Sequence, residues 1–123
     1  MRLRQLLPAV IFATLSAAGA QAQDAEAGKA VFNQQCSICH SPTAGRNQVG
    51  PSLFGIVGST AGQVPNFRFS SANKASGVVF TEANLDRYLT DPRGMIPGTI
   101  MTYNGLKDAT KRANLIAYLA TLH

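Results

Sequence analysis

The 123-residue sequence has only two cysteines, two histidines and no tryptophan. Both cysteines and the only internal histidine fall in one stretch, so no second Cys or His pair exists to complete a four-ligand zinc site. Strand-like alternation of useful length is absent, and so is any internal repeat. Basic residues are scattered and form no run, so the charge pattern does not favour nucleic acid as a partner. What is left is a small helical chain with one concentrated site.

The first residues have the layout of a secretory signal peptide. Arg2 and Arg4 precede an apolar stretch over residues 6–20, and an Ala-Gln-Ala sequence ends at Ala22. A basic start, a short apolar stretch and small residues are typical of a segment that is removed after export. The sequence predicts a cleaved signal peptide over residues 1–22 and a periplasmic domain over residues 23–123, with cleavage after Ala20 as an alternative.

A membrane anchor is the other interpretation of this segment. Pro8, Thr14 and Ser16 interrupt the apolar stretch, which is shorter than the ~20 residues that a span requires. No later segment is long and apolar enough, so we expect no stable membrane insertion. After loss of Arg2 and Arg4, nine basic residues remain against six acidic ones. This mild positive charge indicates either a face that steers an acidic partner protein or an ordinary solvated surface.

The run Cys36-Ser37-Ile38-Cys39-His40 has the attachment pattern of a c-type haem. Two thiols one helical turn apart can each add to a vinyl group on the same edge of a porphyrin, which gives two thioether links. The adjacent imidazole then ligates the iron through one ring nitrogen. A redox dithiol would be expected after a strand, whereas the residues before Cys36 have a helical pattern. A disulfide between Cys36 and Cys39 would close too small a loop to constrain the unfolded chain much.

Capping residues and hydrophobic periodicity predict three helices. Asp24 is an N-cap candidate for a helix that runs to about residue 35, with Gly28 and Phe32 on one face. A glycine within a helix costs roughly 0.5–1 kcal/mol relative to alanine, so Gly28 indicates a close backbone neighbour. The expected neighbour is a last helix after Asp108. Its apolar stripe is Leu115, Tyr118, Leu119 and Leu122.

A third helix is predicted from about Thr81 to Asp91-Pro92, and a short helical turn at Asn73-Lys74. About 40 residues between the first and third predicted helices are rich in glycine and proline, and a loop this long argues against a compact domain. A haem removes this objection because its porphyrin supplies apolar surface. The residues expected to pack against it are Leu53, Phe67, Phe69, Val79 and Phe80. The alternative is that these aromatic residues make a small conventional core.

The axial position opposite His40 has three candidates in the sequence, Met95, Met101 and His123. Met101 follows Ile96-Pro97-Gly98, where proline and glycine favour a rigid turn that can present a thioether. Met95 lies next to Gly94, and His123 is at the end of the chain. Methionines fill gaps in cores more often than they bind metals, so local sequence leaves the ligand open.

The chain resembles the class I c-type cytochromes, closest to the bacterial periplasmic carriers and mitochondrial cytochrome c. The resemblance covers the whole predicted domain. It rests on ordered motifs at residues 28–32, 36–40, 50–55, 62–67, 72–74, 88–92, 96–101 and 115–119. It implies an all-α cytochrome c fold, in which small helices and long loops wrap around one covalently attached haem.

The resemblance also implies roles for individual residues. Met101 matches the sulfur ligand of the family, and Pro51 matches the residue whose carbonyl orients the ligating imidazole. Tyr88, Thr99 and Asn73 match positions of a polar network around the methionine and a propionate. Gly28, Phe32, Leu115 and Tyr118 match the crossing of the first and last helices.

Several positions depart from the family pattern. Phe80, Phe69 and Ser59 stand where the family often has a tryptophan, a tyrosine and an arginine that bond the propionates. Around the expected haem edge, the family's lysines are only partly present. Lys29 and Lys107 remain, Arg93 and Arg46 substitute, and Gln34, Gln48 and Ile100 carry no charge. The docking face is therefore expected to be less basic and more apolar.

An iron ligated by both His40 and Met101 has no open position for a substrate. The first hypothesis is a monomeric, soluble one-electron carrier that is not an enzyme. Its donor would be a dehydrogenase or membrane complex, and its acceptor an oxidase, reductase or reaction centre. The second hypothesis is a haem enzyme or gas-binding protein with a labile methionine. The third is a dedicated electron-accepting subunit of one periplasmic dehydrogenase.

Overall fold

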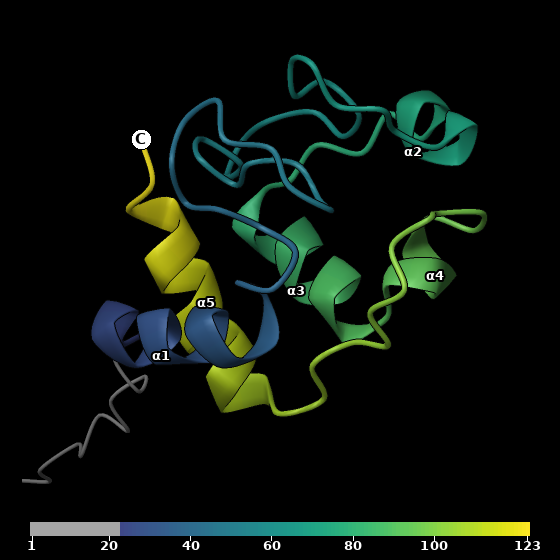
Figure 1. Ribbon diagram of the computed structural model, residues 1–123. Helices are drawn as coiled ribbons and strands as arrows, with labels where there is room; N and C mark the ends of the chain where they lie inside the picture. The colour runs from purple at the N-terminus through teal and green to yellow at the C-terminus, as the bar shows by residue number, and fades with distance from the viewer. Residues whose placement is uncertain (1–22) are drawn as a thin grey trace, which may run out of the picture.

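The computed structural model describes residues 23–123, so the predicted signal peptide lies outside the described residues. Within these described residues there are five helices, α1 (Ala25–Gln35), α2 (Ser71–Ala75), α3 (Glu82–Thr90), α4 (Pro92–Met95) and α5 (Ala109–Ala120) (Figure 1). Within residues 23–123 the only β-type pairing is an isolated bridge between Thr60 and Val79. The predicted all-α class is confirmed. None of the helices in this part of the chain is both long and apolar enough to cross a membrane.

Helices α1 and α5 cross at Gly28, as the sequence predicts. A Cβ atom added at Gly28 would lie only 1.8 Å from the carbonyl oxygen of Asn114, so only glycine fits here. The ring centroids of Phe32 and Tyr118 are 5.4 Å apart next to this crossing. The backbone N–H of Asp24 donates to the side-chain oxygen of Asn114 at 3.0 Å. The start of α1 is therefore joined to the middle of α5, and the first and last helices lie against each other (Figure 1).

Helix α3 begins and ends close to the predicted residues, but the interpretation of Pro92 as only a stop signal is incomplete. Asp91 caps the C-terminus of α3 and the N-terminus of α4, where its Oδ1 accepts from the N–H of Gly94 at 3.1 Å. Pro92 occupies the first turn of α4, where its missing N–H costs nothing. The proline thus redirects the chain into a second short helix before Met101.

Side-chain hydrogen bonds hold the long loop between α1 and α2. Ser52 is buried, and its hydroxyl donates to the carbonyl of Thr43 at 2.6 Å. Asn47 accepts from the N–H of Ser52 at 2.9 Å and donates to the carbonyl of Pro65 at 2.9 Å. These bonds satisfy backbone groups that a loop leaves without partners. The loop is ordered without forming regular secondary structure.

Of the residues expected to pack against the haem, Val79 is the one whose side chain is exposed. Its side chain is 40% exposed, because bridge pairing with Thr60 turns it outward while the neighbouring Val78 packs against the core. Phe80 is buried, with its ring centroid 5.2 Å from that of Tyr88, and Phe67 and Phe69 meet edge to face. The aromatic residues therefore also contact one another.

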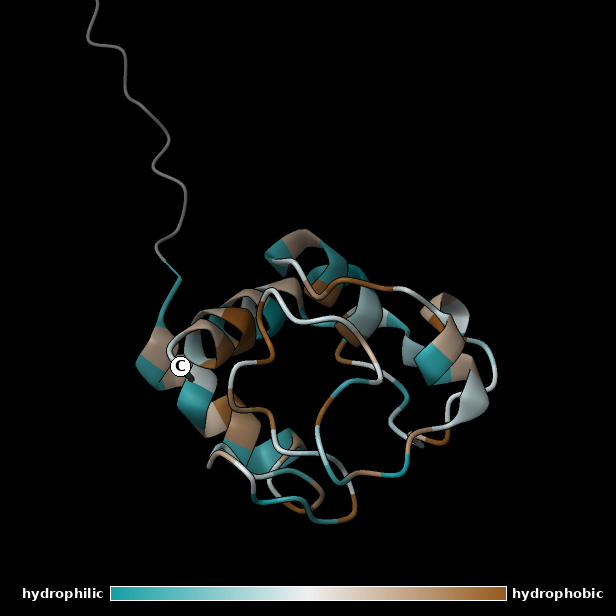
Figure 2. Ribbon diagram, turned by 90° about the horizontal axis from the view of Figure 1, so that it is seen from above, coloured by the Kyte–Doolittle hydropathy of each residue, from teal (hydrophilic) through white to brown (hydrophobic). Residues whose placement is uncertain are grey.

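The core lies between the helices and the inner side of the loops. Seen from above, helices and loops form a ring around the middle of the molecule (Figure 2). The buried apolar residues are Val31, Phe32, Ile56, Ala61, Phe80, Leu85, Tyr88, Leu89, Ile96, Leu106, Leu115, Ile116 and Leu119. Cys36 and Met101, which are far apart in sequence, are both partly buried against this core. The fold therefore brings the attachment motif and the methionine loop to the same interior.

Candidate haem-binding site

The cysteine motif continues the helical path of α1. The N–H of Cys36 donates to the carbonyl of Phe32 at 2.8 Å, and the N–H groups of Cys39 and His40 both donate to the carbonyl of Cys36, at 3.1 and 2.9 Å. This turn sets the two thiols about one helical turn apart, the spacing that two thioether links require. Neither cysteine is part of a disulfide.

The chemistry of the thiols does not suit a redox dithiol. Burial, together with the neighbouring Cys39, raises the pKa of the Cys36 thiol to about 11. Reactive dithiols instead have a lowered pKa, because the thiolate is the nucleophile. The motif also follows a helix, α1, and residues 23–35 contain no strand before it. Both observations disfavour the dithiol interpretation.

The His40 ring is fixed on two sides. Its Nδ1 lies 2.8 Å from the carbonyl oxygen of Pro51. A carbonyl can only accept, so Nδ1 carries the proton and Nε2 keeps a free lone pair. Burial lowers the pKa of His40, and the hydrogen bond to Pro51 opposes this effect. The result is a neutral, oriented imidazole with one free donor nitrogen, which is the form that binds iron.

Gly50 contacts the flat side of the same ring. A Cβ atom added at Gly50 would lie 2.3 Å from Cε1 of His40 and 2.6 Å from Nδ1. The N–H of Gly50 also donates to the carbonyl of Cys39 at 2.8 Å, which ties this loop to the motif. Sequence reasoning assigned no role to Gly50 beside the histidine. The sequence feature that could have indicated this contact is the position of the glycine, directly before Pro51, the residue predicted to orient the imidazole.

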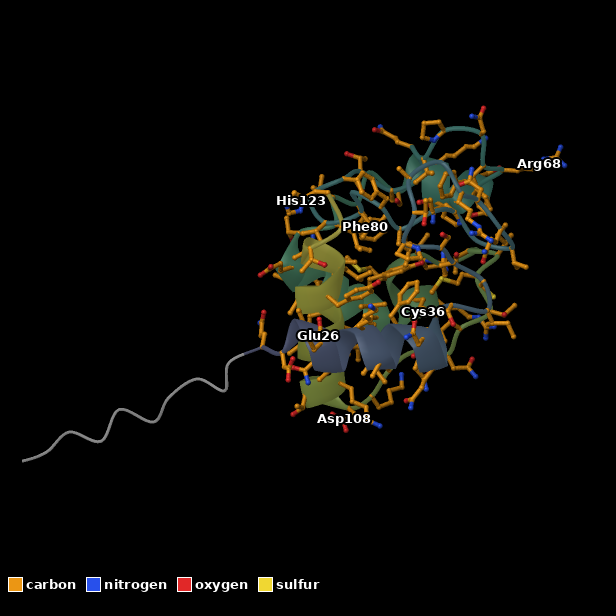
Figure 3. All side chains as sticks on the ribbon, turned by 60° about the vertical axis from the view of Figure 1, so that its left-hand side comes forward. Glu26, Cys36, Arg68, Phe80, Asp108 and His123 are labelled. Atoms are coloured by element: carbon orange, nitrogen blue, oxygen red, sulfur yellow. The ribbon has the colours of Figure 1, made fainter. Side chains whose placement is uncertain are left out.

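Of the three candidates for the second axial ligand, Met95 and Met101 are both partly buried against the core, and His123 is exposed. Met101 is partly buried, and its Sδ accepts a hydrogen bond from the hydroxyl of Tyr88 at 3.6 Å. Its N–H donates to the hydroxyl of Thr99 at 3.3 Å. Met95 is in α4, and His123 is exposed, with Nδ1 3.0 Å from the carbonyl of Ala120. His123 lies far from Cys36 (Figure 3).

Among the polar residues expected around the haem, Tyr88 is buried, and Asn73 and Thr99 are partly buried. Burial raises the pKa of Tyr88, and a hydrogen bond with Thr99 opposes the shift. Among the described residues, Asn73 Oδ1 is the one buried side-chain oxygen or nitrogen without a hydrogen-bond partner. A buried polar atom without a partner points to a missing polar ligand group, because leaving it unpaired costs about 1–3 kcal/mol.

The three substituted positions offer no replacement donors. The Ser59 hydroxyl donates to the carbonyl of Ile56 at 2.7 Å, and Phe69 and Phe80 are engaged with other aromatic rings. Arg68, close to Phe69 in sequence, points away from the molecule (Figure 3). The expected loss of donors at these positions is therefore evident in the folded chain.

Taken as a donor set, these residues fit a c-type haem. Two thiols one turn apart suit covalent attachment, and a neutral imidazole and a partly buried thioether are common axial ligands of haem iron. Asn73 and Thr99 add polar atoms in the same interior. No other part of the described chain combines these groups.

Comparisons with known proteins identify a single family, and the match covers nearly all of the described residues. The Cytochrome c family model matches residues 25–123. Cytochrome c2 of Rhodopila globiformis is 47% identical over 77% of this chain and 90% of its own length. Cytochrome c2 of Blastochloris viridis is 43% identical over 95% of this chain and 92% of its own length.

A solved structure agrees. Cytochrome cH from Methylobacterium extorquens superimposes with a TM-score of 0.75 and 41% sequence identity, over 80% of this chain and 98% of its own. Its similarity therefore extends over the helices and the loops that carry the motif. With the attachment motif at the end of α1, an oriented imidazole and matches across residues 25–123, this chain belongs to the cytochrome c family and is a class I c-type cytochrome with one covalently bound haem c.

Proposed function

We propose that this cytochrome is a soluble periplasmic electron carrier in which Cys36 and Cys39 attach the haem and His40 and Met101 ligate its iron. When bound, the haem supplies reversible one-electron chemistry. The observation that carries the proposal is the commitment of His40 Nδ1 to the Pro51 carbonyl, which leaves Nε2 as the free donor. With Met101 as the second ligand, the chain leaves no axial position for a substrate.

The surrounding residues would then tune the site. Pro51 orients the imidazole, and Tyr88 and Thr99 hold the Met101 loop through the contacts described above. Asn73 Oδ1, which can only accept, would take a hydrogen bond from a bound water or from a protonated propionate. Phe69 would contribute apolar surface without a propionate donor. Methionine ligation favours the reduced iron relative to a second histidine, and a shielded pocket has the same effect.

Export to the periplasm rests on the first 22 residues. Their basic and apolar pattern favours a cleaved signal peptide. The match to cytochrome c2 of Blastochloris viridis covers 95% of the chain, which is more than residues 23–123 alone can supply, so it includes part of this segment. Mass spectrometry of protein from the periplasm should give a mature chain that begins at Gln23.

A carrier role is favoured over catalysis by the contacts of Met101. The side chains that hydrogen-bond to Met101 are Tyr88 and Thr99, and neither is an acid or base at neutral pH. Because burial raises the pKa of Tyr88 further, its hydroxyl keeps its proton. The partners of a carrier would be a dehydrogenase or membrane complex as donor, and an oxidase, reductase or reaction centre as acceptor.

Absorption spectra of the purified holoprotein test this function. The reduced and oxidised forms are recorded before and after carbon monoxide is added to the reduced form. A c-type reduced spectrum, a weak red methionine–iron band in the oxidised form and no response to carbon monoxide are expected. A response to the gas, without the methionine band, would instead support a gas-binding or catalytic haem protein with a labile Met101.

The remaining alternative is a fixed subunit of one periplasmic dehydrogenase, which would have the same haem ligands. Gel filtration of a periplasmic extract distinguishes the two. The carrier elutes as a monomer and is reduced by several donors at salt-dependent rates. Stable co-purification with one enzyme would support the subunit instead.

A further inference from the structure

One asparagine of the chain is directly followed by a glycine. The sequence has seven asparagines, and only Asn104 precedes a glycine, Gly105. The side chain of the following residue normally hinders attack of its backbone nitrogen on the asparagine amide, and glycine has no side chain. This pair is therefore the asparagine position of the sequence with the least steric protection.

The structure leaves the pair open to water. Asn104 is exposed, and residues 101–108 form neither helix nor strand. Figure 1 shows this segment crossing from α4 to α5 at the outside of the molecule. No backbone carbonyl of residues 23–123 accepts a hydrogen bond from the N–H of Gly105. The nitrogen that would attack the amide is therefore not held in backbone pairing within this part of the chain.

The glycine is required by the fold. Gly105 has a φ of +105°, a backbone conformation that side chains rarely adopt, and an added Cβ would overlap the carbonyl oxygen of Thr90. The next residue, Leu106, is buried, and its N–H donates to the carbonyl of Leu89 at 2.7 Å. The packing of this segment on the end of α3 therefore keeps an unshielded nitrogen next to Asn104.

We propose that Asn104 is a site of spontaneous deamidation. The nitrogen of Gly105 bonds to Cγ of Asn104, and its proton leaves with the amide group as ammonia, which gives a five-membered succinimide. Water then opens the ring at one of its two carbonyl carbons. Breaking the new bond gives aspartate, and breaking the original peptide bond gives isoaspartate, in which the chain continues through Cβ and Cγ. No electrons are transferred, so the reaction requires only water.

Both products add a negative charge to a segment that has none. Residues 92–107 contain no aspartate or glutamate. The nearby cations are the exposed Lys107 and Arg93, whose guanidinium donates to the carbonyl of Thr102 at 3.4 Å. Charge interactions between exposed groups are weak, so the added charge alone should disturb the segment little.

Isoaspartate also lengthens the backbone by one carbon. The segment is held on both sides of Asn104, because the hydroxyl of Tyr103 donates to Gln35 Oε1 at 3.1 Å and the N–H of Leu106 donates to α3. The extra atom fits between these two fixed points only if one of them shifts. Met101 is three residues before Asn104, so isoaspartate should loosen the Met101 loop. This consequence, unlike the modification itself, rests on the proposed role of Met101 as an iron ligand.

Ageing of the holoprotein at neutral pH and physiological temperature tests the site. Peptide mass spectrometry follows each asparagine, and methyl transfer by an isoaspartyl carboxyl methyltransferase measures isoaspartate. The peptide with Asn104 should gain about 1 Da at least about tenfold faster than the peptide with Asn66. Asn66 is the internal control, because it is also exposed but precedes Phe67. Equal rates at the two positions, or no gain at Asn104, would overturn the proposal.

Two variants separate the added charge from the added backbone atom. Asn104→Gln keeps an amide but would need a six-membered ring, so it should accumulate no acidic form during the same incubation. Fresh Asn104→Asp carries the charge on a normal backbone. The isoaspartate fraction of aged wild type, isolated by ion-exchange and hydrophobic-interaction chromatography, is compared with it. In the reduced form this fraction should bind carbon monoxide at least about tenfold faster than Asn104→Asp, which should stay within about twofold of the unmodified protein.

These measurements keep the inferences apart. Deamidation at Asn104 with no change in gas binding would retain the modification site and reject its effect on Met101. Equal gas binding by Asn104→Asp and the isoaspartate fraction would assign the effect to charge and reject the role of the added atom. Carbon monoxide binding by the fresh, unmodified protein would reject ligation by Met101, while the mass gain at Asn104 would still support the modification.

Discussion

The hydroxyl of Tyr88 donates to the sulfur of Met101 at 3.6 Å, and this contact joins helix α3 to the loop after α4. Tyr88 is 8% exposed, so few water molecules compete for its hydroxyl. A proton donor on a ligating thioether withdraws electron density and makes the sulfur a weaker donor to oxidised iron. The hydrogen bond therefore favours the reduced iron over the oxidised iron.

Replacing Tyr88 with phenylalanine should therefore lower the midpoint potential. A differential hydrogen-bond contribution of about 0.5–1 kcal/mol corresponds to about 20–45 mV for one electron. Tyr118→Phe is the control, because Tyr118 packs on Phe32 in the helix crossing instead of on the methionine. Spectroelectrochemical titration measures both variants, and an unchanged potential in Tyr88→Phe would contradict this role for the hydroxyl.

Met101→Leu should open one axial position of the iron. Leucine conserves volume but has no donor atom, so the reduced variant should bind carbon monoxide and lose the red methionine–iron band. Met95→Leu makes the same exchange six residues earlier and should keep the wild-type spectrum. Gas binding by the Met95 variant, with none by the Met101 variant, would transfer the ligand assignment to Met95.

Gly50→Ala should displace the His40 ring, because the added Cβ would lie 2.3 Å from Cε1. Movement of the ring breaks its hydrogen bond to Pro51, so the iron–imidazole bond should weaken. The expected result is a lower haem content and an altered electron paramagnetic resonance spectrum of the oxidised protein. Gly45→Ala is the control, because nothing lies within 4 Å of its added Cβ. The control should cost about 1–2 kcal/mol of stability for its left-handed backbone and leave the spectrum unchanged.

Gly28→Ala should destabilise the crossing of α1 and α5. An added Cβ would overlap the carbonyl oxygen of Asn114, and such overpacking typically costs about 1–3 kcal/mol. Asn33→Ala places the same residue at an exposed site of the same helix and should be nearly neutral. Guanidinium unfolding of the oxidised holoprotein compares the two, and equal stabilities would show that the helices separate without cost.

Removing the Arg112 guanidinium should lower the stability more than removing only its ion-pair partner, Asp86. The guanidinium is largely buried and also donates to the carbonyls of Leu106 and Lys107, at 2.9 and 3.0 Å. Arg112→Met leaves these acceptors without a partner and should cost about 2–3 kcal/mol. Asp86→Ala should cost less than about 1 kcal/mol, because the carboxylate side chain is 50% exposed. Thermal unfolding of both variants checks this order.

The helices and the attachment motif could be predicted because their signals are local. Asp24 and Asp108 cap their helices with their own side chains, and Gly28 has no local explanation other than a close neighbour. The ordered motifs of the family then linked Pro51 and Tyr88 to the site. Their contacts in the structure, with His40 and Met101, fit those expectations.

The loop conformations could not be predicted in the same way. Val79 was expected to pack against the haem because it is apolar, but its side chain is 40% exposed where the backbone pairs with Thr60. That pairing joins residues distant in sequence and leaves no alternating pattern to detect. The role of Gly50 could not be predicted for the same reason. Its contact with His40 depends on the conformation of the loop that follows the cysteine motif.

The hydrogen bond between Asp24 and Asn114 spans 90 positions of the chain, and the helix crossing beside it closes a loop of similar length. The native packing of α1 therefore depends on α5, the last helix of the chain, and contacts between segments so far apart in sequence form slowly. Until then, the cysteine motif that follows α1 has no fixed surroundings. The thiols of Cys36 and Cys39 therefore remain accessible for haem attachment until the last helix packs on α1 and the fold encloses them.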